Sequence, residues 1–302
     1  MKKHNPHEQF FLNTFGNVET MRPFLKSTLP QKLLDLIDVG SIEYIKETQI
    51  DTKLHKNISD LVVKTSLTES NEPVDIYFLF EHKSAYDDKI LFQILRYMLT
   101  IWEKDLKEKK KPRIIIPFIF YHGETRWKLR KLSEFLTDNL ELRKFMINIP
   151  YLLFDTADFG IEKSVKYFSD SIRLRLSLEM LKRAFIKSRN EVKDLLEIIA
   201  QSGILDNEKE AEQFMFYFFK ISDLETEEFM SIISNDLSIN RKSEVKMVSL
   251  YDRMIQEGAL KNAVETCKKA LLAGAPIEFV IQITGLPLEK VIEIQKTIHT
   301  GQ

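Results

Sequence analysis

The chain has 302 residues, of which 44% are hydrophobic, so it can bury a sizeable core and does not have the composition of a disordered protein. Its 44 basic and 45 acidic residues leave a formal charge of -1, so any binding of nucleic acid must rest on a local basic patch. The single cysteine, Cys267, excludes an intrachain disulfide framework. We expect it in a helical core, because Ala263 and Leu271 lie four residues to either side.

The histidines and the apolar runs exclude two further classes. None of the six histidines stands in a His-x-x-x-His spacing, which argues against a zinc site. The start of the chain lacks the apolar stretch of a signal peptide, and no apolar run reaches the length of a membrane span. We therefore expect a cytoplasmic protein that does not associate with membranes.

The first 160 residues alternate between helical and strand patterns. Apolar residues at helical spacing predict helices at residues 6–16, 18–37 (interrupted at Pro30) and 87–108. Runs of β-branched and aromatic residues predict strands at residues 41–50, 58–65, 74–81, 114–121 and 151–154. Pro117 cannot donate to a ladder, so it indicates a bulge or a sheet edge within its strand. This order of elements predicts an α/β core with a mixed sheet.

After about residue 160 the pattern is helical throughout. Helices are predicted at residues 165–187, 190–201, 208–221, 226–233 and 243–258, with three more between Lys261 and Thr297. Residues 277–296 form two short amphipathic helices around a Thr-Gly-Leu-Pro turn, which is a helix-turn-helix pattern. Glu289 and Glu293 are acidic side chains, which are unsuited to binding in a DNA groove. A hairpin used for packing or self-association is the alternative.

Asp60, Glu81 and Lys83 are the candidate catalytic residues. A simple hairpin with its turn centred between Ser70 and Asn71 places Asp60 directly opposite Glu81, with Cβ atoms roughly 4.5–5.5 Å apart. At that distance two carboxylates can share a divalent cation such as Mg²⁺. Lys83 falls on the same face and can orient a water nucleophile or stabilise developing phosphorane charge. The alternative is an ion-paired strand end without catalytic function.

Three further residues are accessory candidates. Gln93 and Arg96 share one face of the helix at 87–108 with Tyr97 and Thr100, opposite its apolar stripe. Arg96 could clamp the scissile phosphate there, or the face could form a structural polar network between helix and sheet. Glu8, on the first helix, could accept a hydrogen bond from metal-bound water, or it could be an exposed acid that favours the helix dipole.

His82 and a basic run complete the set of candidates. The His82 side chain alternates away from its two neighbours and is expected to be buried, so its backbone carbonyl is the better metal ligand. Candidate contacts to the DNA backbone are the basic side chains Lys107, Lys109, Lys110, Lys111, Arg113 and Arg126. Acidic residues interleave this run, so a solvated surface without function is the alternative.

Several short motifs follow one another along the first half of the chain. They are His7-Glu8-Gln9-Phe10, Phe24-Leu25-x-x-x-Leu29-Pro30, Ser59-Asp60-Leu61, Tyr77-x-Leu79-x-Glu81-His82-Lys83-Ser84, Leu95-Arg96-Tyr97-Met98, and Ile116-Pro117-x-x-x-Tyr121-His122-Gly123 followed by Trp127. Residues 4–160 thereby resemble the Rpn (YhgA-like) recombination-promoting nucleases, also described as "putative transposases", of the PD-(D/E)XK nuclease superfamily.

The resemblance implies an α-β-β-β-α-β core in which Asp60 binds the metal, Glu81 is the second ligand and Lys83 the third motif residue. It implies Mg²⁺-dependent endonucleolytic cleavage of DNA that supports recombination or mobile-element transfer. The chain departs from the family twice: Lys83 stands where the family usually has Gln, and His7-Glu8 replaces His-Asp. Lysine is the standard choice of the wider superfamily, so the first departure favours activity.

The expected organisation is a PD-(D/E)XK nuclease-like catalytic domain at residues 1–160 and an all-α region at 161–302 for specificity or homo-oligomerisation. Two other functions remain open. One is a catalytically inactive nuclease fold that binds DNA or a partner protein. The other is a helical interaction protein with no role on nucleic acid, which leaves the ordered N-terminal motifs unexplained.

Overall fold

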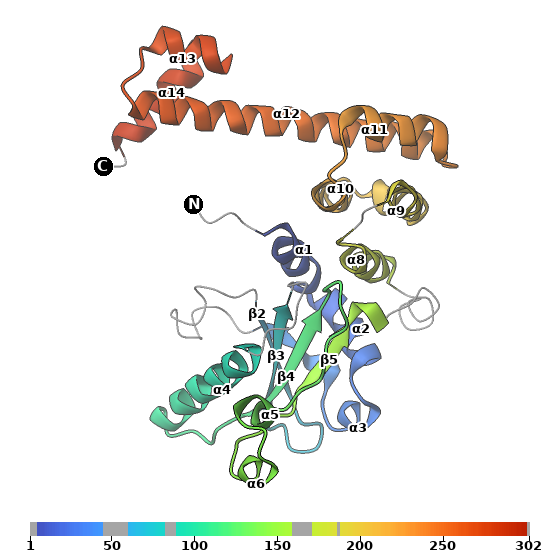
Figure 1. The fold of residues 1–302 in the computed structure, drawn as a ribbon, viewed down its shortest axis with the longest axis vertical. Coiled ribbons are helices and arrows are strands. Elements are labelled where there is room, and N and C mark those ends of the chain that lie inside the picture. Colours follow the sequence, from blue (N-terminus) through green and yellow to red (C-terminus); the bar gives the residue numbers. More distant parts are fainter. Residues whose placement is uncertain (1–4, 45–59, 82–88, 159–170, 186–187, 301–302) are drawn as a thin grey trace. The chain divides into compact units, whose positions relative to one another are not determined.

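The computed structural model describes the chain except residues 1–4, 45–59, 82–88, 159–170, 186–187 and 301–302 (Figure 1). At residues 60, 77–81 and 299–300 it describes the backbone alone. The chain divides into two compact units, residues 1–232 and 233–302. None of the helices in the described part of the chain is long and apolar enough to cross a membrane.

The first unit begins with three helices, α1 (Pro6–Phe15), α2 (Val18–Thr28) and α3 (Gln31–Leu34), followed by the 3₁₀ turn η1 (Val39–Ser41). The side chains of Asn5 and Asn17 cap α1 and α2 by accepting backbone N–H bonds. The predicted interruption at Pro30 is confirmed. Leu29 is extended, with φ -71° and ψ 143°, because the residue before a proline disfavours the helical conformation.

Five strands form one mixed sheet in the order β1-β2-β3-β4-β5: β1 (Glu43–Tyr44), β2 (Asp60–Ser66), β3 (Pro73–Glu81), β4 (Ile114–Tyr121) and β5 (Leu152–Asp155). The first three strands pair antiparallel, and β3, β4 and β5 pair parallel. The predicted α/β architecture with a mixed sheet is therefore confirmed. Pairing between β4 and β5 starts at Phe118. At Pro117, which cannot donate to a ladder, strand β4 therefore pairs only with β3.

The register of the β2–β3 hairpin differs from the predicted one by two residues. Asp60 lies opposite Leu79, not opposite Glu81. The cause is the turn, which closes with a 2.8 Å bond from the Leu67 N–H to the Glu72 carbonyl. Asn71 adopts a left-handed conformation with φ 54° and donates its N–H to the Leu67 carbonyl. Asparagine tolerates this conformation. The turn is therefore centred between Glu69 and Ser70, one residue earlier than predicted.

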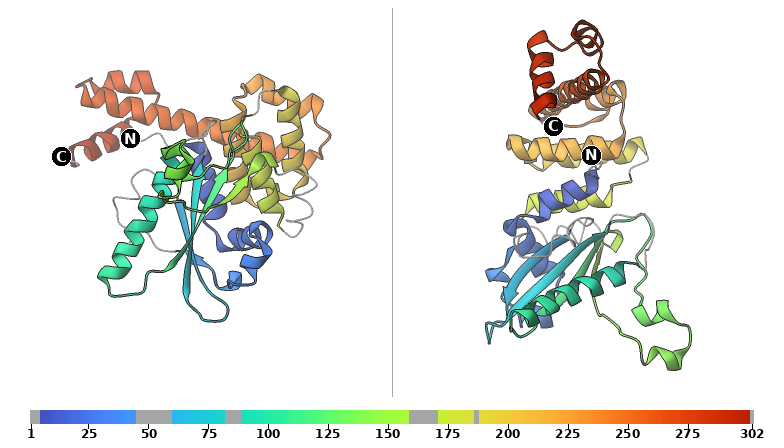
Figure 2. Two further views of the ribbon diagram at one scale, coloured as in Figure 1. Left: turned by 60° about the horizontal axis from the view of Figure 1, so that its bottom comes forward. Right: turned by 90° about the vertical axis from the view of Figure 1, so that its left-hand side faces the viewer.

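The two faces of the sheet carry different layers (Figures 1 and 2). On one face, aromatic rings of α1, α2, β4 and β5 pack together; they are Phe11, Phe15, Phe24, Phe120 and Phe154. The other face is covered by α4 (Lys89–Lys107), whose Ile94 and Ile101 join Val62, Ile119 and Tyr121 in one buried cluster. Two short helices, α5 (Leu132–Leu136) and α6 (Leu140–Arg143), lie in the connection from β4 to β5.

The later described residues of the first unit form helices: η3 (Thr156–Asp158), α8 (Ile172–Lys182), α9 (Arg189–Gln201), η4 (Ile204–Asp206), α10 (Glu208–Ser222) and α11 (Thr226–Ser231). Helix α10 packs on α1, where Tyr217 stacks on Phe10 with ring centroids 3.9 Å apart. The boundary predicted at residue 160 thus falls inside this unit.

The second unit begins within the π-helical turn η5 (Ile232–Asp236) and contains the helices α12 (Arg241–Leu272), α13 (Ile277–Thr284) and α14 (Leu288–Thr300). The prediction that a helix ends at Gly258 is wrong, because α12 continues through it. An interior glycine weakens a helix by roughly 1 kcal/mol, too little to end a helix of 32 residues. The predicted hairpin of α13 and α14 packs on α12, and Cys267 is buried there, as expected.

Candidate functional site

Asp60 begins β2 and Glu81 ends β3, so both candidates lie at one end of two paired central strands. Because Asp60 lies opposite Leu79, position 81 is its diagonal neighbour two residues further on. Diagonal neighbours are roughly 7–8 Å apart, compared with 4.5–5.5 Å for directly opposed residues. A register shift of two residues preserves the alternation, so both positions remain on one face of the sheet.

That face is the one covered by α4. Val62, two residues after Asp60, packs in the cluster beneath α4, and alternation puts position 60 on the same side. Glu81 is in parallel register with Tyr121, which belongs to the same cluster. Two independent neighbours therefore assign both acidic positions to the α4 face.

The start of α4 follows the end of β3 after a short connection, so its first turns lie at the end of the sheet that carries Glu81. Gln93 is half-buried and Arg96 is exposed, one and two turns into this helix. Tyr97 is only 3% exposed and belongs to the core cluster, so the prediction that it lies opposite the apolar stripe is wrong. Thr100 donates its hydroxyl to the Arg96 carbonyl within the helix.

Glu8 lies in the first turn of α1, which packs on the opposite face of the sheet from α4. The neighbouring residue His7 forms a 2.9 Å hydrogen bond between its Nδ1 atom and the Tyr217 hydroxyl. The His7 ring lies 5.2 Å from that of His122, which directly follows β4. The first turn of α1 is thus fixed at the carboxyl end of β4, half-buried, by contacts from α10.

Two of the predicted site residues, His82 and Lys83, lie outside the described residues. Their roles, and the side-chain geometry of Asp60 and Glu81, stay predictions. Among the side chains that the structure describes, no group of three or more His, Cys, Asp or Glu residues is placed to hold a metal ion.

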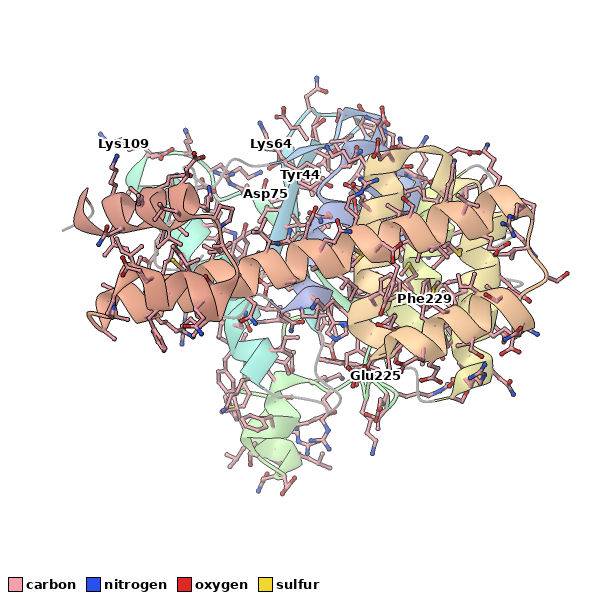
Figure 3. The ribbon with its side chains drawn as sticks, turned by 90° about the horizontal axis from the view of Figure 1, so that it is seen from above. Tyr44, Lys64, Asp75, Lys109, Glu225 and Phe229 are labelled. Atoms are coloured by element: carbon pink, nitrogen blue, oxygen red, sulfur yellow. The ribbon has the colours of Figure 1, made fainter. Side chains whose placement is uncertain are left out.

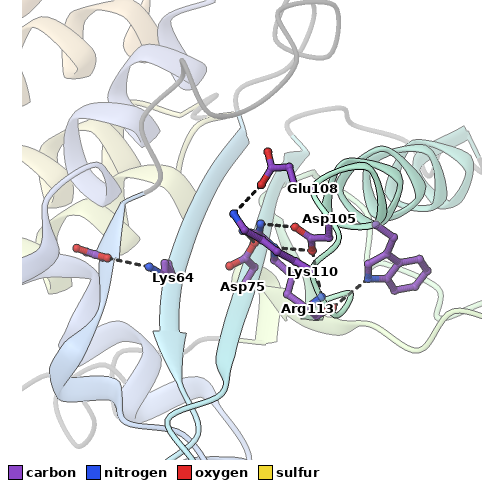
Figure 4. A network of polar contacts seen from close by, with 8 residues as sticks. Lys64, Asp75, Asp105, Glu108, Lys110 and Arg113 are labelled. Carbon is purple, nitrogen blue, oxygen red and sulfur yellow. Dashed lines mark hydrogen bonds and ion pairs between the residues drawn. The ribbon is translucent and has the colours of Figure 1, made fainter.

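The structure gives Arg113 a different role from the predicted DNA contact (Figure 4). Its guanidinium donates to both carboxylate oxygens of Asp105, at 2.9 and 2.6 Å, and to Asp75 at 3.2 Å. Asp75 and Asp105 are 0% and 1% exposed. Arg113 therefore neutralises two buried acids and joins the end of α4 to β3 and β4, which leaves little of it to bind phosphate. Figure 3 labels Asp75 beside Lys64, its register partner on β2.

Burial and the contacts with Arg113 shift the pKa values of Asp75 and Asp105 in opposite directions. Burial raises the pKa of Asp75, against the lowering effect of Arg113. Hydrogen bonds from the Arg113 side chain lower the pKa of Asp105, because they favour its ionised form. The same two acids raise the pKa of Arg113, which stays a permanent cation.

The remaining basic candidates divide by position. Lys107, Lys109, Lys110 and Lys111 precede the first residue of β4, whereas Glu81 is in register with its last residue. At about 3.3 Å per residue, the length of β4 separates the run from Glu81 by roughly 23 Å. Lys110 and Lys111 pair with Glu108 and Glu72. Arg126 follows the carboxyl end of β4 and pairs with Asp158 at 3.0 Å, so it is the basic candidate at the same end as Glu81.

Asp155 is a residue that the sequence did not single out as part of the site. It is in register with Tyr121, in the same row across the parallel strands as Glu81. Both carboxylate oxygens accept backbone bonds of 2.9 Å, from Trp127 and from Ala157. Asp155 therefore holds the loop after β4 in place. Its position at the end of a predicted strand was the sequence signal that could have identified it.

Comparison with known proteins identifies the family. The family model described as "Putative transposase, YhgA-like" matches residues 5–214. Recombination-promoting nuclease RpnD of Escherichia coli O157:H7 is 25% identical over 269 residues, covering 85% of this chain and 97% of its own. Recombination-promoting nuclease RpnA of Escherichia coli K12 is 24% identical over 294 residues, covering 94% and 95%.

A third relative carries a different name. RpnE of Escherichia coli K12, named an inactive recombination-promoting nuclease-like protein, is 23% identical over 261 residues, covering 84% of this chain and 83% of its own. No solved structure matches this chain.

Proposed function

The chain belongs to the YhgA-like family, and on that premise we propose that it is a Mg²⁺-dependent DNA endonuclease with a PD-(D/E)XK core. Its relatives' names supply the nuclease role and recombination as the context. The observation that carries the catalytic part is the position of Asp60 and Glu81 on neighbouring strands, at one end and on one face of the sheet. The element order α-β-β-β-α-β through β4 supports the proposed core.

The residues present fit a magnesium ion. Mg²⁺ is usually held by one or two carboxylates and keeps several waters, so two acids in diagonal positions suit it. Asp60 and Glu81 would hold the ion, with the backbone carbonyl of His82 as a third oxygen ligand. When bound, the ion supplies Lewis-acid stabilisation of the phosphodiester and lowers the pKa of a coordinated water.

The chain's own residues supply the rest of the chemistry. Lys83, two residues beyond Glu81, would orient the attacking water and stabilise the charge that develops on the phosphorane. Arg96 and Gln93, at the same end of the sheet on α4, would position the DNA phosphate, and Arg126 would contact the backbone further along. Glu8, in the first turn of α1, would accept a hydrogen bond from a metal-bound water.

The test is nicking of supercoiled plasmid by purified full-length protein, with and without Mg²⁺. Asp60→Ala and Glu81→Ala should each abolish Mg²⁺-dependent cleavage, because each removes an oxygen ligand. Lys83→Ala should lower the cleavage rate at least about tenfold more than it weakens DNA binding, since its charge acts in the transition state. Asp138→Ala is the matched control, because that carboxylate is fully exposed on another part of the surface.

A catalytically inactive module that binds DNA is the second candidate, favoured by the relative named inactive. Plasmid that stays intact in Mg²⁺ and Mn²⁺, with DNA binding retained, would decide for it. Cleavage that persists in the Asp60 and Glu81 variants would show that the metal site lies elsewhere.

A further inference from the structure

The connection from β4 to β5 carries an excursion, residues 133–148, that contains α6 and most of α5 and projects from the first unit (Figure 2). Its two ends meet, because the Ser133 N–H donates to the Asn148 side chain at 3.2 Å. Inside it, the Arg143 guanidinium donates to the Thr137 carbonyl at 2.9 Å. Hydrogen bonds therefore give the excursion a defined shape.

The excursion has no core of its own. Between residues 134 and 148, all of which the structure describes, no side chain is buried. Leu140 is 70% exposed and Phe145 is 82% exposed. Six large apolar side chains of the excursion are exposed in all: Phe135, Leu136, Leu140, Leu142, Phe145 and Ile147. Because they do not stabilise the excursion by burial, we infer that they serve a contact with another molecule.

The exposed apolar area matches what a stable interface requires. A whole aromatic side chain presents about 150–250 Å², so these six side chains leave roughly 600 Å² of apolar surface open to water. A standard interface buries about 800 Å² on each partner, and a little over half of that area is apolar. The excursion alone would therefore supply the apolar part of one side of such an interface.

The charges of the excursion favour a protein partner over nucleic acid. Both of its basic side chains are paired with its own acids: Arg143 with Asp138 at 3.7 Å, and Lys144 with Glu141. The formal charge of the excursion is -1, from two basic and three acidic residues. It therefore has no excess positive charge with which to attract DNA phosphates.

A basic strip, Lys128, Arg130 and Lys131, lies just before the excursion, and all three of its basic side chains are exposed. A basic segment and an acidic segment thus follow one another in the chain. In a two-fold interface the same surface meets itself, so the basic strip of one copy can face the acidic excursion of the other. This arrangement makes the surface complementary to a second copy of itself.

We propose that the excursion docks on a second copy of this chain and forms a two-fold dimer. The apolar side chains of the two excursions bury one another, and the basic strip of each copy faces the acids of its partner. The contact needs neither DNA nor a metal, so it does not rest on the proposed nuclease activity. It is also separate from residues 161–302, for which the sequence predicted homo-oligomerisation.

The first test is sedimentation velocity of the full-length chain at micromolar concentrations, without DNA or metal. We expect a dimer that dissociates on dilution. Leu140→Glu combined with Phe145→Glu should weaken dimerisation at least about tenfold, because the apolar contact is lost. Leu36→Glu is the matched control, because that side chain is also exposed and lies after α3, away from the excursion.

Charge reversal tests the two-fold arrangement. Lys128→Glu with Lys131→Glu, and separately Glu134→Lys with Glu141→Lys, should each weaken dimerisation, because like charges then face one another. An equal mixture of the two variants should associate again, since the reversed strip of one copy meets the reversed excursion of the other. Failure of the mixture to associate would overturn the two-fold pairing.

A photo-crosslinker locates the contact without removing charge. With p-benzoylphenylalanine in place of Phe145, illumination should give a product of twice the chain mass, joined within residues 126–148 of the second copy. Circular dichroism identifies any variant that fails to fold, and the crosslink then tests the same surface. A wild-type chain that stays monomeric would overturn the proposal, as would a dimer unaffected by the Leu140 and Phe145 substitutions. A folded variant that loses affinity for DNA and keeps its self-association would assign the excursion to DNA instead.

Discussion

At the scale of residues, Arg113 is held between two buried carboxylates, Asp75 and Asp105. Their contributions to the free energy of unfolding change with pH in opposite directions. Asp105 supplies both oxygens to the guanidinium, so Asp105→Asn should lower the free energy of unfolding by about 3 kcal/mol at pH 7. Asp75 makes a single 3.2 Å bond, and its other oxygen is buried without a donor among the described residues. Asp75→Asn should therefore cost only about 1 kcal/mol.

The sign of the pH dependence separates the two variants. The pKa of Asp105 is lowered in the folded state, so its contribution is present above its ordinary pKa and lost as pH falls. The pKa of Asp75 is raised, so its contribution is complete below its ordinary pKa and lost as pH rises through the raised value. Urea unfolding from about pH 2 to pH 7 should show the advantage of the wild type over Asp105→Asn growing with pH up to about pH 4 and staying level above it. The advantage over Asp75→Asn should shrink, and parallel curves would contradict both assignments.

At the scale of elements, the β2–β3 turn sets the spacing of the candidate ligands through one residue. Asn71 has φ 54°, a conformation that β-branched residues adopt only with strain. Asn71→Val should therefore lower the free energy of unfolding by about 1–2 kcal/mol, whereas Asn71→Gly should be nearly neutral. Thermal unfolding measures both, with Ser70→Val as the neighbouring control. A Val variant as stable as the Gly variant would mean that the turn does not require the left-handed conformation.

The sequence could predict elements whose signals are local. Alternating apolar runs predicted the strands, Pro30 predicted the break before α3, and Cys267 was expected in a helical core, as the structure has them. The hairpin register was not predictable from alternation, because a shift of two residues leaves the pattern unchanged and the left-handed turn decides it. For Arg113 the contact to DNA stays a prediction. Its structural partner Asp105 is eight residues away among the acids of the same run, whereas its second partner Asp75 is 38 residues away and gives no local signal.

At the scale of the whole molecule, the catalytic unit should extend well beyond the part that carries the motifs. The carboxyl end of the sheet meets α1, and α10 covers α1 through Tyr217 and Phe214, which pack on Phe10 and His7. All the proposed metal ligands precede residue 84, yet the compact unit ends at Ile232. The proposed metal site and the folding unit therefore have different boundaries in this chain.

Two fragments test that difference. A fragment of residues 1–232 should fold and keep Mg²⁺-dependent nicking, because it retains the whole first unit. A fragment of residues 1–201 lacks α10 and exposes the buried face of Phe10, so it should unfold at least about 10 °C lower or aggregate. Circular dichroism melting and the plasmid assay measure both properties on the same samples. Full stability and activity in the shorter fragment would show that α10 is dispensable, and a folded but inactive 1–232 fragment would assign part of the catalysis to residues 233–302.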